Sequence, residues 1–191
     1  MAEDGELARD GDLLLRRMQQ DDLSLLVTWR NEPHVRAWWE MDGDPVPYTL
    51  DDAREEYGPD LETGGPSIPA IIRVHDRPVG YVQWYRWAEY PDEVAAVGLP
   101  ADADAFGLDI LVGEPDTVGT GVGSATVDLV CRTLFAERGA SCVALLTAVG
   151  NEPAQRAYEK AGMRKIRHAL DTDIKDGRRV ESWLMVRYRD T

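Results

Sequence analysis

The segment Thr117–Val130, TVGTGVGSATVDLV, constrains this chain most, because alternating glycines stand directly before an apolar pattern of helical period. Glycine lets backbone N–H groups approach an anion closely, and a helix N-terminus stabilises negative charge. A Rossmann fingerprint would need GxGxxG and a P-loop would need Gly-Lys-Ser/Thr, and neither pattern is present here. The segment therefore indicates either a loop that cradles a phosphate through backbone amides or a glycine-rich turn without a ligand.

Length, charge and cysteine content exclude several classes of protein. A chain of 191 residues is long enough for one domain with a full core. Its net charge of −14 argues against nucleic acid and membrane partners, and no apolar run approaches the roughly 20 residues of a membrane span. The two cysteines, Cys131 and Cys142, form no CxxC and have no histidine nearby, so we expect neither a metal site nor a disulfide framework. A reduced, cytoplasmic protein is the default expectation, and the sequence leaves monomer or homodimer open.

Charge is distributed unevenly along the chain. The start, MAEDGELARDGD, is acidic and lacks an apolar core, so we expect a flexible tail over residues 1–12 rather than a secretory signal. Residues 13–191 contain no repeat or linker and are expected to form a single domain. The window Trp87–Cys131 holds nine Asp or Glu residues and no Lys or Arg, which indicates either a cation-binding site or a well-solvated face.

Hydrophobic periodicity and turn residues predict a mixed α/β order. Expected strands are Leu13–Met18, Ala70–Val74, Val79–Trp87, Phe106–Pro115, Cys142–Val149 and two closing strands, 163–171 and 181–189, around the turn Lys175–Gly177. Expected helices are two short ones within 21–39, then Thr49–Leu61, Gly123–Glu137 and one that runs from Asn151 to a stop at Gly162.

A second motif, taken together with the glycine segment, indicates a protein family. The order strand, GxGxG, helix, strand and then N-x6-Y-E-K-A-G, Asn151 to Gly162, resembles the GNAT superfamily of N-acetyltransferases. The resemblance implies an α/β (α+β) fold with a central mixed, mostly antiparallel sheet flanked by helices. It also implies acetyl-CoA as cosubstrate at a splayed strand pair, with the pyrophosphate in the glycine loop and no metal. The cofactor-binding residues so implied are Leu111, Val112, Val118, Gly119, Thr120, Gly121, Val122, Gly123, Ser124, Asn151 and Tyr158. Val118 departs from the family, whose loop usually opens with Arg or Gln there.

The N-terminal half narrows the resemblance. The pattern W-x4-H-V-x2-W-W, from Trp29 to Trp39, and the later EEYGP, GYVQWY and GLDIL segments look like aminoglycoside 6'-N-acetyltransferases. A polycationic antibiotic calls for convergent carboxylates and flat aromatic walls, which fits the acidic window. The substrate-binding residues expected on this basis are Trp38, Trp39, Tyr57, Gln83, Tyr85, Asp102, Asp104, Asp109 and Asp176.

Several of these residues also have a purely structural interpretation. Adjacent Trp38 and Trp39 cannot both face one way on a helix, so either is open to a core role. Tyr57 and Tyr85 suit packing as well as a cleft, Asp102 and Asp104 suit loop solvation, and His34 is expected to be structural. Asp109 differs, because a carboxylate inside the apolar strand GLDILV is costly unless it is paired or used.

Amide formation sets the expected mechanism. The amine must be neutral to attack a thioester, so a base must take its proton. We expect Asp109 to be this base, with Asp102 or Asp104 assisting, and backbone N–H groups near Leu111 and Val112 to stabilise the oxyanion. Tyr158 is expected to protonate the departing thiolate, without a covalent enzyme intermediate.

Alternatives remain at the level of the substrate. The 6' enzymes carry an Asp at the end of the strand before the Asn helix, and this chain has none before Asn151. Other amines are therefore candidates, such as a hydroxylamine-bearing siderophore precursor, a polyamine-like metabolite or a protein N-terminus. The siderophore-type relatives carry His-x-Asp where this chain has Gly107-Leu108-Asp109, which counts against them. A non-catalytic module that binds acyl-CoA or a cationic drug is the alternative from a different class.

Overall fold

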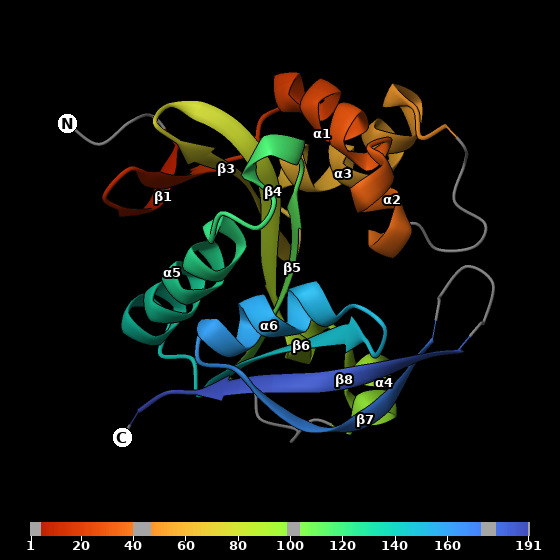
Figure 1. The fold of residues 1–191 in the computed structure, drawn as a ribbon, viewed down its shortest axis with the longest axis vertical. Helices are drawn as coiled ribbons and strands as arrows, with labels where there is room; N and C mark the ends of the chain where they lie inside the picture. Colours follow the sequence, from red (N-terminus) through yellow and green to blue (C-terminus); the bar gives the residue numbers. More distant parts are fainter. Residues whose placement is uncertain (1–4, 40–46, 99–103, 173–178, 191) are drawn as a thin grey trace.

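The computed structural model describes residues 5–39, 47–98, 104–172 and 179–190 of the chain (Figure 1). Its strands form one eight-stranded sheet in the order β1-β2-β3-β4-β5-β6-β8-β7. Only β5 and β6 pair in parallel, and the other neighbours are antiparallel. This confirms the expected mixed, mostly antiparallel sheet. The strands are β1 (Glu6–Asp10), β2 (Leu13–Arg17), β3 (Ser67–Val74), β4 (Arg77–Arg86), β5 (Ala105–Val112), β6 (Cys142–Ala148), β7 (Arg164–Thr172) and β8 (Arg179–Tyr188).

The first strand corrects the expectation of a flexible tail over residues 1–12. Residues Glu6–Asp10 pair antiparallel with β2 and form the edge of the sheet. Leu7 and Ala8 pack against the main hydrophobic core, and Asp10 is ion-paired with Arg132. The acidic composition of the segment concealed these two apolar residues, which pack on the core while the strand pairs with β2.

The helices follow the predicted order, with one addition. They are α1 (Leu23–Arg30), α2 (Pro33–Trp39), α3 (Leu50–Thr63), α4 (Pro91–Val97), α5 (Val122–Glu137) and α6 (Glu152–Lys160), together with the 3-10 turns η1 (Gln20–Asp22), η2 (Trp87–Glu89) and η3 (Pro115–Thr117). Thr49 caps α3 in a reciprocal capping box with Asp52. The addition is α4, in the acidic connection, where Pro91 begins the helix and Gly98 ends it at φ 59°.

Strand alternation divides the core between the two faces of the sheet. Val82, Trp84 and Leu108 point to the main core, which α5 covers and to which α6 contributes Tyr158. Tyr81 and Leu111, on the opposite face, belong to the core shared with α1 and α3. In Figure 1, α5 lies on one side of β4 and β5, and α1, α2 and α3 lie on the other. The burial of Trp84 confirms the expectation that one face of this strand is core.

The parallel pair β5–β6 is short. It comprises only Ala105 to Gly107 opposite Cys142 to Ala144, although β5 continues to Val112 and β6 to Ala148. Beyond these pairs β5 remains bonded to β4 and β6 to β8, so the sheet splays between them. This gap is the splayed strand pair that the family resemblance implies.

Within the described ranges, no helix combines the length and the apolar character needed to cross a bilayer.

Candidate active site

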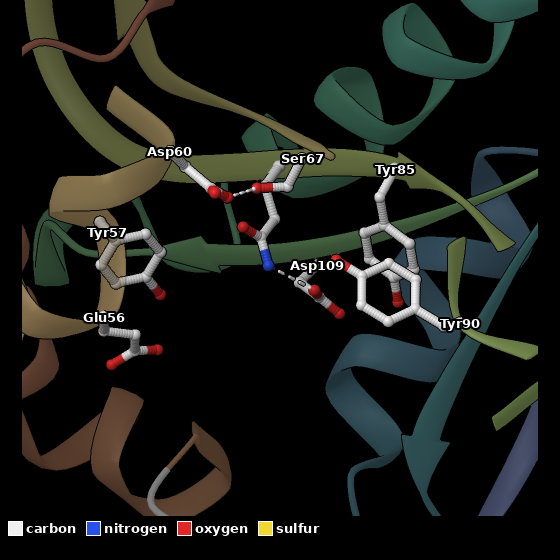
Figure 2. Close-up of a pocket in the computed structure, with 8 residues that line it drawn as sticks. Glu56, Tyr57, Asp60, Ser67, Tyr85, Tyr90 and Asp109 are labelled. Carbon is white, nitrogen blue, oxygen red and sulfur yellow. Dashed lines mark hydrogen bonds between the residues drawn. The ribbon is translucent and has the colours of Figure 1, made fainter. Parts of the chain in front are cut away.

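A pocket of about 260 Å³ lies where α3, the strands β3 to β5 and the start of α4 meet (Figure 2). Three carboxylates and three tyrosines dominate its wall, and no Lys or Arg is among the lining residues. The lining residues are Glu56, Tyr57, Asp60, Ser67, Gln83, Tyr85, Tyr90 and Asp109. A concave site with converging carboxylates and aromatic faces suits a cation.

Asp109 occupies the centre of this site through its place on β5. It lies opposite Gln83 in the register of β4 and β5, and the Gln83 Nε2 amide donates a 2.8 Å hydrogen bond to Asp109 Oδ2. The buried Tyr81 hydroxyl in turn donates to Gln83 Oε1 at 2.7 Å. The carboxylate that looked costly inside an apolar strand therefore has a polar partner on the neighbouring strand and faces the pocket.

The wall formed by α3 contains two carboxylates that the sequence analysis did not single out. Glu56 accepts a 2.8 Å hydrogen bond from the Tyr48 hydroxyl, and the buried Arg30 guanidinium lies 3.6 Å from it. Asp60 accepts a 2.6 Å bond from Ser67 Oγ (Figure 2). Their spacing of four residues puts them on one helix face beside Tyr57, and this spacing was the available signal. It was concealed because the segment also carries the ordinary acids of a helix start.

The aromatic residues of the pocket form two edge-to-face groups. Tyr57 and Tyr81 have ring centroids 5.5 Å apart. Tyr85 lies 5.4 Å from Trp87 and 5.0 Å from Tyr90. Tyr57 is buried and also lines the pocket, so the packing and cleft roles expected as alternatives are combined in one side chain. Burial, and then the charge of Glu56, hold the pKa of the Tyr57 hydroxyl well above its usual range.

The adjacent tryptophans of α2 face different ways, as helical geometry requires. Trp39 packs against the core of α1 and α3, with its ring 6.3 Å from Tyr81 in an edge-on arrangement. Trp38 is 50% exposed and lies beside Gly150, where an added Cβ would be 3.7 Å from its ring. Neither is part of the pocket wall described above. His34 Nε2 is 3.0 Å from the Val112 carbonyl oxygen, which ties α2 to the end of β5 and fits the expected structural role.

Of the predicted acids other than Asp109, the structure describes Asp104. Asp104 is exposed, ion-paired with Arg86 at 3.6 Å, and outside the pocket, so the structure does not bring it to Asp109. It stands in the turn directly before β5, and its expected roles in substrate binding and proton transfer stay predictions. Asp102 and Asp176 fall outside the described residues.

The glycine loop has the backbone that its sequence predicts. Gly119 and Gly121 adopt φ of 78° and 100°, and α5 begins at Val122 directly after them. A Cβ at either position would meet nothing within 4 Å, so the left-handed backbone rather than space demands glycine. Val118 is 50% exposed at the mouth of the loop. Two hydroxyls brace the turns, since Thr120 Oγ1 donates to the Thr117 carbonyl and Ser124 Oγ to the Gly121 carbonyl.

The end of β5 presents backbone groups to the splay. Gly113 N donates to the Val79 carbonyl at 2.9 Å, so alternation along the strand turns the N–H groups of Ile110 and Val112 away from β4 and toward the gap. The same alternation directs the N–H of Leu111 to β4 and buries its side chain under α1 and α3. Of the two amides expected to stabilise an oxyanion, only that of Val112 therefore faces the gap.

The YEKAG helix adds two residues on the other side of the gap. The Asn151 side chain caps α6 by accepting a 3.2 Å bond from Ala154 N, a structural role that the sequence analysis did not give it. Tyr158 is half-buried, and burial followed by the charge of Asp109 raises the pKa of its hydroxyl. Tyr158 is therefore protonated at neutral pH, within electrostatic reach of Asp109.

No group of three or more His, Cys, Asp or Glu side chains that could hold a metal occurs among the described residues. Both cysteines are free and buried, and burial raises the pKa of the Cys131 thiol to about 12. They behave as small core residues, as expected.

Comparison with known proteins gives the family. The Acetyltransferase (GNAT) domain model matches residues 18–170. The aminoglycoside N(6')-acetyltransferase type 1 of Klebsiella pneumoniae is 28% identical over 159 residues, 79% of this chain and 73% of that protein. Lysine N-acyltransferase MbtK of Mycobacterium tuberculosis is 29% identical over 122 residues, 64% of this chain and 54% of that protein. A structure of AAC(6')-Ib in complex with ribostamycin and coenzyme A matches with a TM-score of 0.76 at 27% identity, over 93% of this chain and 94% of that one. With the family match spanning the glycine loop, the splay and the pocket alike, the chain belongs to the GNAT family of acetyltransferases.

Proposed function

We propose that this enzyme transfers the acetyl group of acetyl-CoA to an amine of a cationic aminoglycoside, at the 6' position. The observation that carries the proposal is the position of Asp109. Its carboxylate lines the acidic pocket, and its charge reaches Tyr158 on the helix beyond the splay. The pocket that we assign to the amine and the gap between β5 and β6 that we assign to acetyl-CoA thus both lie near the Asp109 carboxylate.

Backbone N–H groups support the assignment of the acetyl-CoA site. The amides at the glycine loop and the N-terminus of α5 suit a pyrophosphate, and the N–H groups of β5 that face the gap suit the amide groups of the pantetheine arm. The residues of this site are those implied by the family resemblance, from Val118 to Ser124 with Val112, Asn151 and Tyr158. The solved AAC(6')-Ib structures, crystallised with coenzyme A, support the same assignment.

The negative charge of the pocket supports the assignment of the aminoglycoside site. Glu56, Asp60 and Asp109 surround a pocket whose wall has no basic residue, and Tyr85 and Tyr90 provide flat faces. The net charge of −14 adds a long-range attraction for a polycation. We assign to Glu56 and Asp60 the binding of the ammonium groups that are not acetylated. In the 6' enzymes an Asp at the end of the strand before the Asn helix is available for substrate binding, and this chain has no acid directly before Asn151. The similarity to an aminoglycoside N(6')-acetyltransferase, and to AAC(6')-Ib structures in complex with kanamycin and with ribostamycin, supports this substrate class.

The chemistry is a direct transfer. Asp109 takes a proton from the ammonium, directly or through water, and the neutral amine attacks the thioester carbon. The N–H of Val112 stabilises the oxyanion that forms. As the C–S bond breaks, the Tyr158 hydroxyl gives its proton to the sulfur. The nitrogen loses its second proton, which restores the Tyr158 hydroxyl, and the proton on Asp109 passes to solvent, so the products are the acetamide and the free thiol of CoA. Such an activity would confer antibiotic resistance on a cell that holds the enzyme in its cytoplasm.

One relative favours a second candidate. The match to lysine N-acyltransferase MbtK favours acyl transfer onto the amine of a lysine-like substrate, and the siderophore-type hydroxylamine is the related alternative that the sequence left open. Against it, the chain lacks the His of the His-x-Asp element, where Gly107 stands.

Release of free CoA thiol from acetyl-CoA tests the proposal. Kanamycin, tobramycin, an aminoglycoside with a hydroxyl in place of the 6' amine, and a lysine-derived hydroxylamine are supplied separately. We expect turnover only with the drugs that carry the 6' amine. Turnover with the hydroxylamine alone would replace the proposed substrate with the second candidate. Because both cysteines are buried, a disulfide reagent detects the thiol of CoA without a large protein background.

A further inference from the structure

We propose that Tyr81 and Gln83 are positioning residues for Asp109: the Tyr81 hydroxyl fixes which end of the Gln83 amide faces the carboxylate, and the amide fixes the carboxylate itself. This inference rests on the proposed function, in which Asp109 takes the proton of the amine. It gives Gln83, which also lines the pocket, a role within the protein in addition to the contact with substrate expected from the sequence.

The Gln83 side-chain amide has two chemically different ends. One end is a donor and the other an acceptor, and a bond rotation exchanges them. The orientation in the structure directs Nε2 to Asp109 Oδ2 at 2.8 Å. The reverse orientation would place the Oε1 lone pairs against an ionised carboxylate, which is repulsive. A donor for the acceptor end therefore strengthens the orientation in which Gln83 supports the charged form of Asp109.

Tyr81 supplies that donor at 2.7 Å from Oε1. A tyrosine hydroxyl can donate or accept, so its preference depends on its surroundings. Burial is the main cause that raises the pKa of the Tyr81 hydroxyl, and Tyr57 and Asp109 contribute after it. The hydroxyl therefore retains its proton throughout the working range of an enzyme. Its proton goes to Gln83, and the amide is held with its donor end toward Asp109.

Packing makes this arrangement rigid. Tyr81 is 0% exposed, and its ring is edge-on to Tyr57 at 5.5 Å and to Trp39 at 6.3 Å. Its partner across the strands is the buried Leu111. A side chain fixed on all sides can hold a hydrogen bond without the entropic cost that an exposed one would carry.

Other titratable groups face Asp109, and their charges affect the pH at which it takes up its proton. They come from each element around it and comprise Glu56, Tyr57 and Asp60 of α3, Tyr81 and Tyr85 of β4, Tyr90 at the start of α4, and Tyr158 of α6. Burial raises the pKa values of the Tyr57, Tyr81 and Tyr158 hydroxyls and keeps them neutral, so the negative charges beside Asp109 come from the acids of α3. Their repulsion favours a protonated Asp109, and the Gln83 amide opposes it.

The test uses Tyr81→Phe, which removes one hydroxyl and keeps the ring. Without a partner for Oε1 the amide is held less firmly in the orientation that supports the charged form, and the pH at which Asp109 takes up its proton should rise. We expect the acidic limb of the profile of kcat/KM against pH to move to higher pH. The turnover number should fall about tenfold, the effect of losing one hydrogen bond in the transition state. The KM for acetyl-CoA should not change. Tyr188→Phe, at an exposed tyrosine near the end of β8, is the matched control.

A second variant and a second measurement separate this inference from the proposed function. Gln83→Met removes both ends of the amide at similar volume and should produce the same shift, and adding Tyr81→Phe to it should have no further effect. Carboxyl ¹³C NMR of the free enzyme, with Asp109→Asn to assign the signal, follows proton uptake without any substrate. An unchanged Asp109 titration in both variants would overturn the positioning role even if aminoglycosides are acetylated. A shifted titration in an enzyme that ignores aminoglycosides would uphold it and remove only the proposed substrate.

Discussion

The ring of Tyr85 lies directly on Gly107, its partner across β4 and β5, so closely that a Cβ added to Gly107 would stand 2.5 Å from two ring carbons. The same ring is edge-on to Trp87 and Tyr90. Because Gly107 has no side chain, the Tyr85 ring can lie against the sheet, which leaves the pocket open.

Gly107→Ala should push Tyr85 outward into the pocket. We expect the KM for the aminoglycoside to rise about tenfold or more, since the steric cost of overpacking is about 1–3 kcal/mol, while the KM for acetyl-CoA stays within twofold. Steady-state kinetics with each substrate varied in turn make the comparison. An equal loss for both substrates would mean that the change disturbs the splay rather than the pocket.

Two glycines of the loop give a matched pair. Gly121 has φ of 100°, whereas Gly123 has an ordinary backbone and a Cβ there would lie 3.6 Å from Val112 Cγ2, an ordinary contact. Gly121→Ala should cost about 1–2 kcal/mol in stability and weaken acetyl-CoA binding, because alanine resists the left-handed region. Gly123→Ala should fold with wild-type stability. Thermal unfolding with and without CoA distinguishes them, and equal losses in both variants would contradict the backbone argument.

Local signals in the sequence predicted most of the fold. Thr49 with acids in the first turn predicted α3, and Gly162 after YEKA predicted the end of α6, because both depend on neighbouring residues only. The exception, α4, had the same kind of signal in Pro91 and Gly98, but the run of acids around it favoured a solvated connection.

The site was harder to predict, because it is made by contacts between distant segments. Asp109 was found from its unusual place in an apolar strand, whereas Asp60 is defined by its bond to Ser67 and by a pocket that closes only when α3 packs on the sheet. The edge strand β1 was missed for a similar reason, since its docking depends on the core that β2 and α5 complete. Asp104 lies in the same acidic window as Asp109, but its place outside the apolar strand left both loop solvation and a role in the site open.

Val118 is the position where the family usually places Arg or Gln. Its side chain is 50% exposed at the mouth of the glycine loop, so a longer residue fits without disturbing the core. Val118→Arg should lower the KM for acetyl-CoA by about threefold to tenfold, the value of one charged hydrogen bond to phosphate at an exposed site. The gain should shrink at 0.5 M salt. An unchanged KM would show that the pyrophosphate lies away from this end of the loop.

Asp60 provides a test of the charge assigned to α3. Asp60→Asn keeps the shape and a partner for Ser67 Oγ but removes one negative charge from the pocket. We expect the KM of an aminoglycoside with four or five amines to rise about tenfold, and that of a small monoamine to change little. Asp51→Asn, at an exposed site on the same helix, is the control for the overall loss of charge. If the two variants behave alike, Asp60 acts only through the general field of the protein.

Asp128 links three elements, and its ionisation should make stability depend on pH. It accepts hydrogen bonds from Arg132 at 2.8 Å and from Arg187 of β8 at 2.7 Å, and Arg187 also donates to the Ala161 carbonyl at the end of α6. Burial pushes the pKa of the Asp128 carboxyl upward, but the two guanidinium groups outweigh it and hold this pKa below its usual range. A carboxyl with a lowered pKa in the folded state adds stability above its unfolded pKa of about 3.9, and this stability is lost as the pH falls through the folded value.

Asp128→Asn should therefore destabilise the protein by about 1 kcal/mol at pH 7, a figure kept small because the side chain is partly exposed to solvent. The difference from wild type should persist to about pH 4 and shrink below it, as the wild-type carboxyl takes up its proton. Urea unfolding at pH 7, 4 and 3 provides the free energies, with Asp92→Asn on the exposed side of α4 as the control for lost charge. A difference that stays constant down to pH 3 would mean that the hydrogen-bonding shape of the side chain, and not its charge, holds α5 to β8.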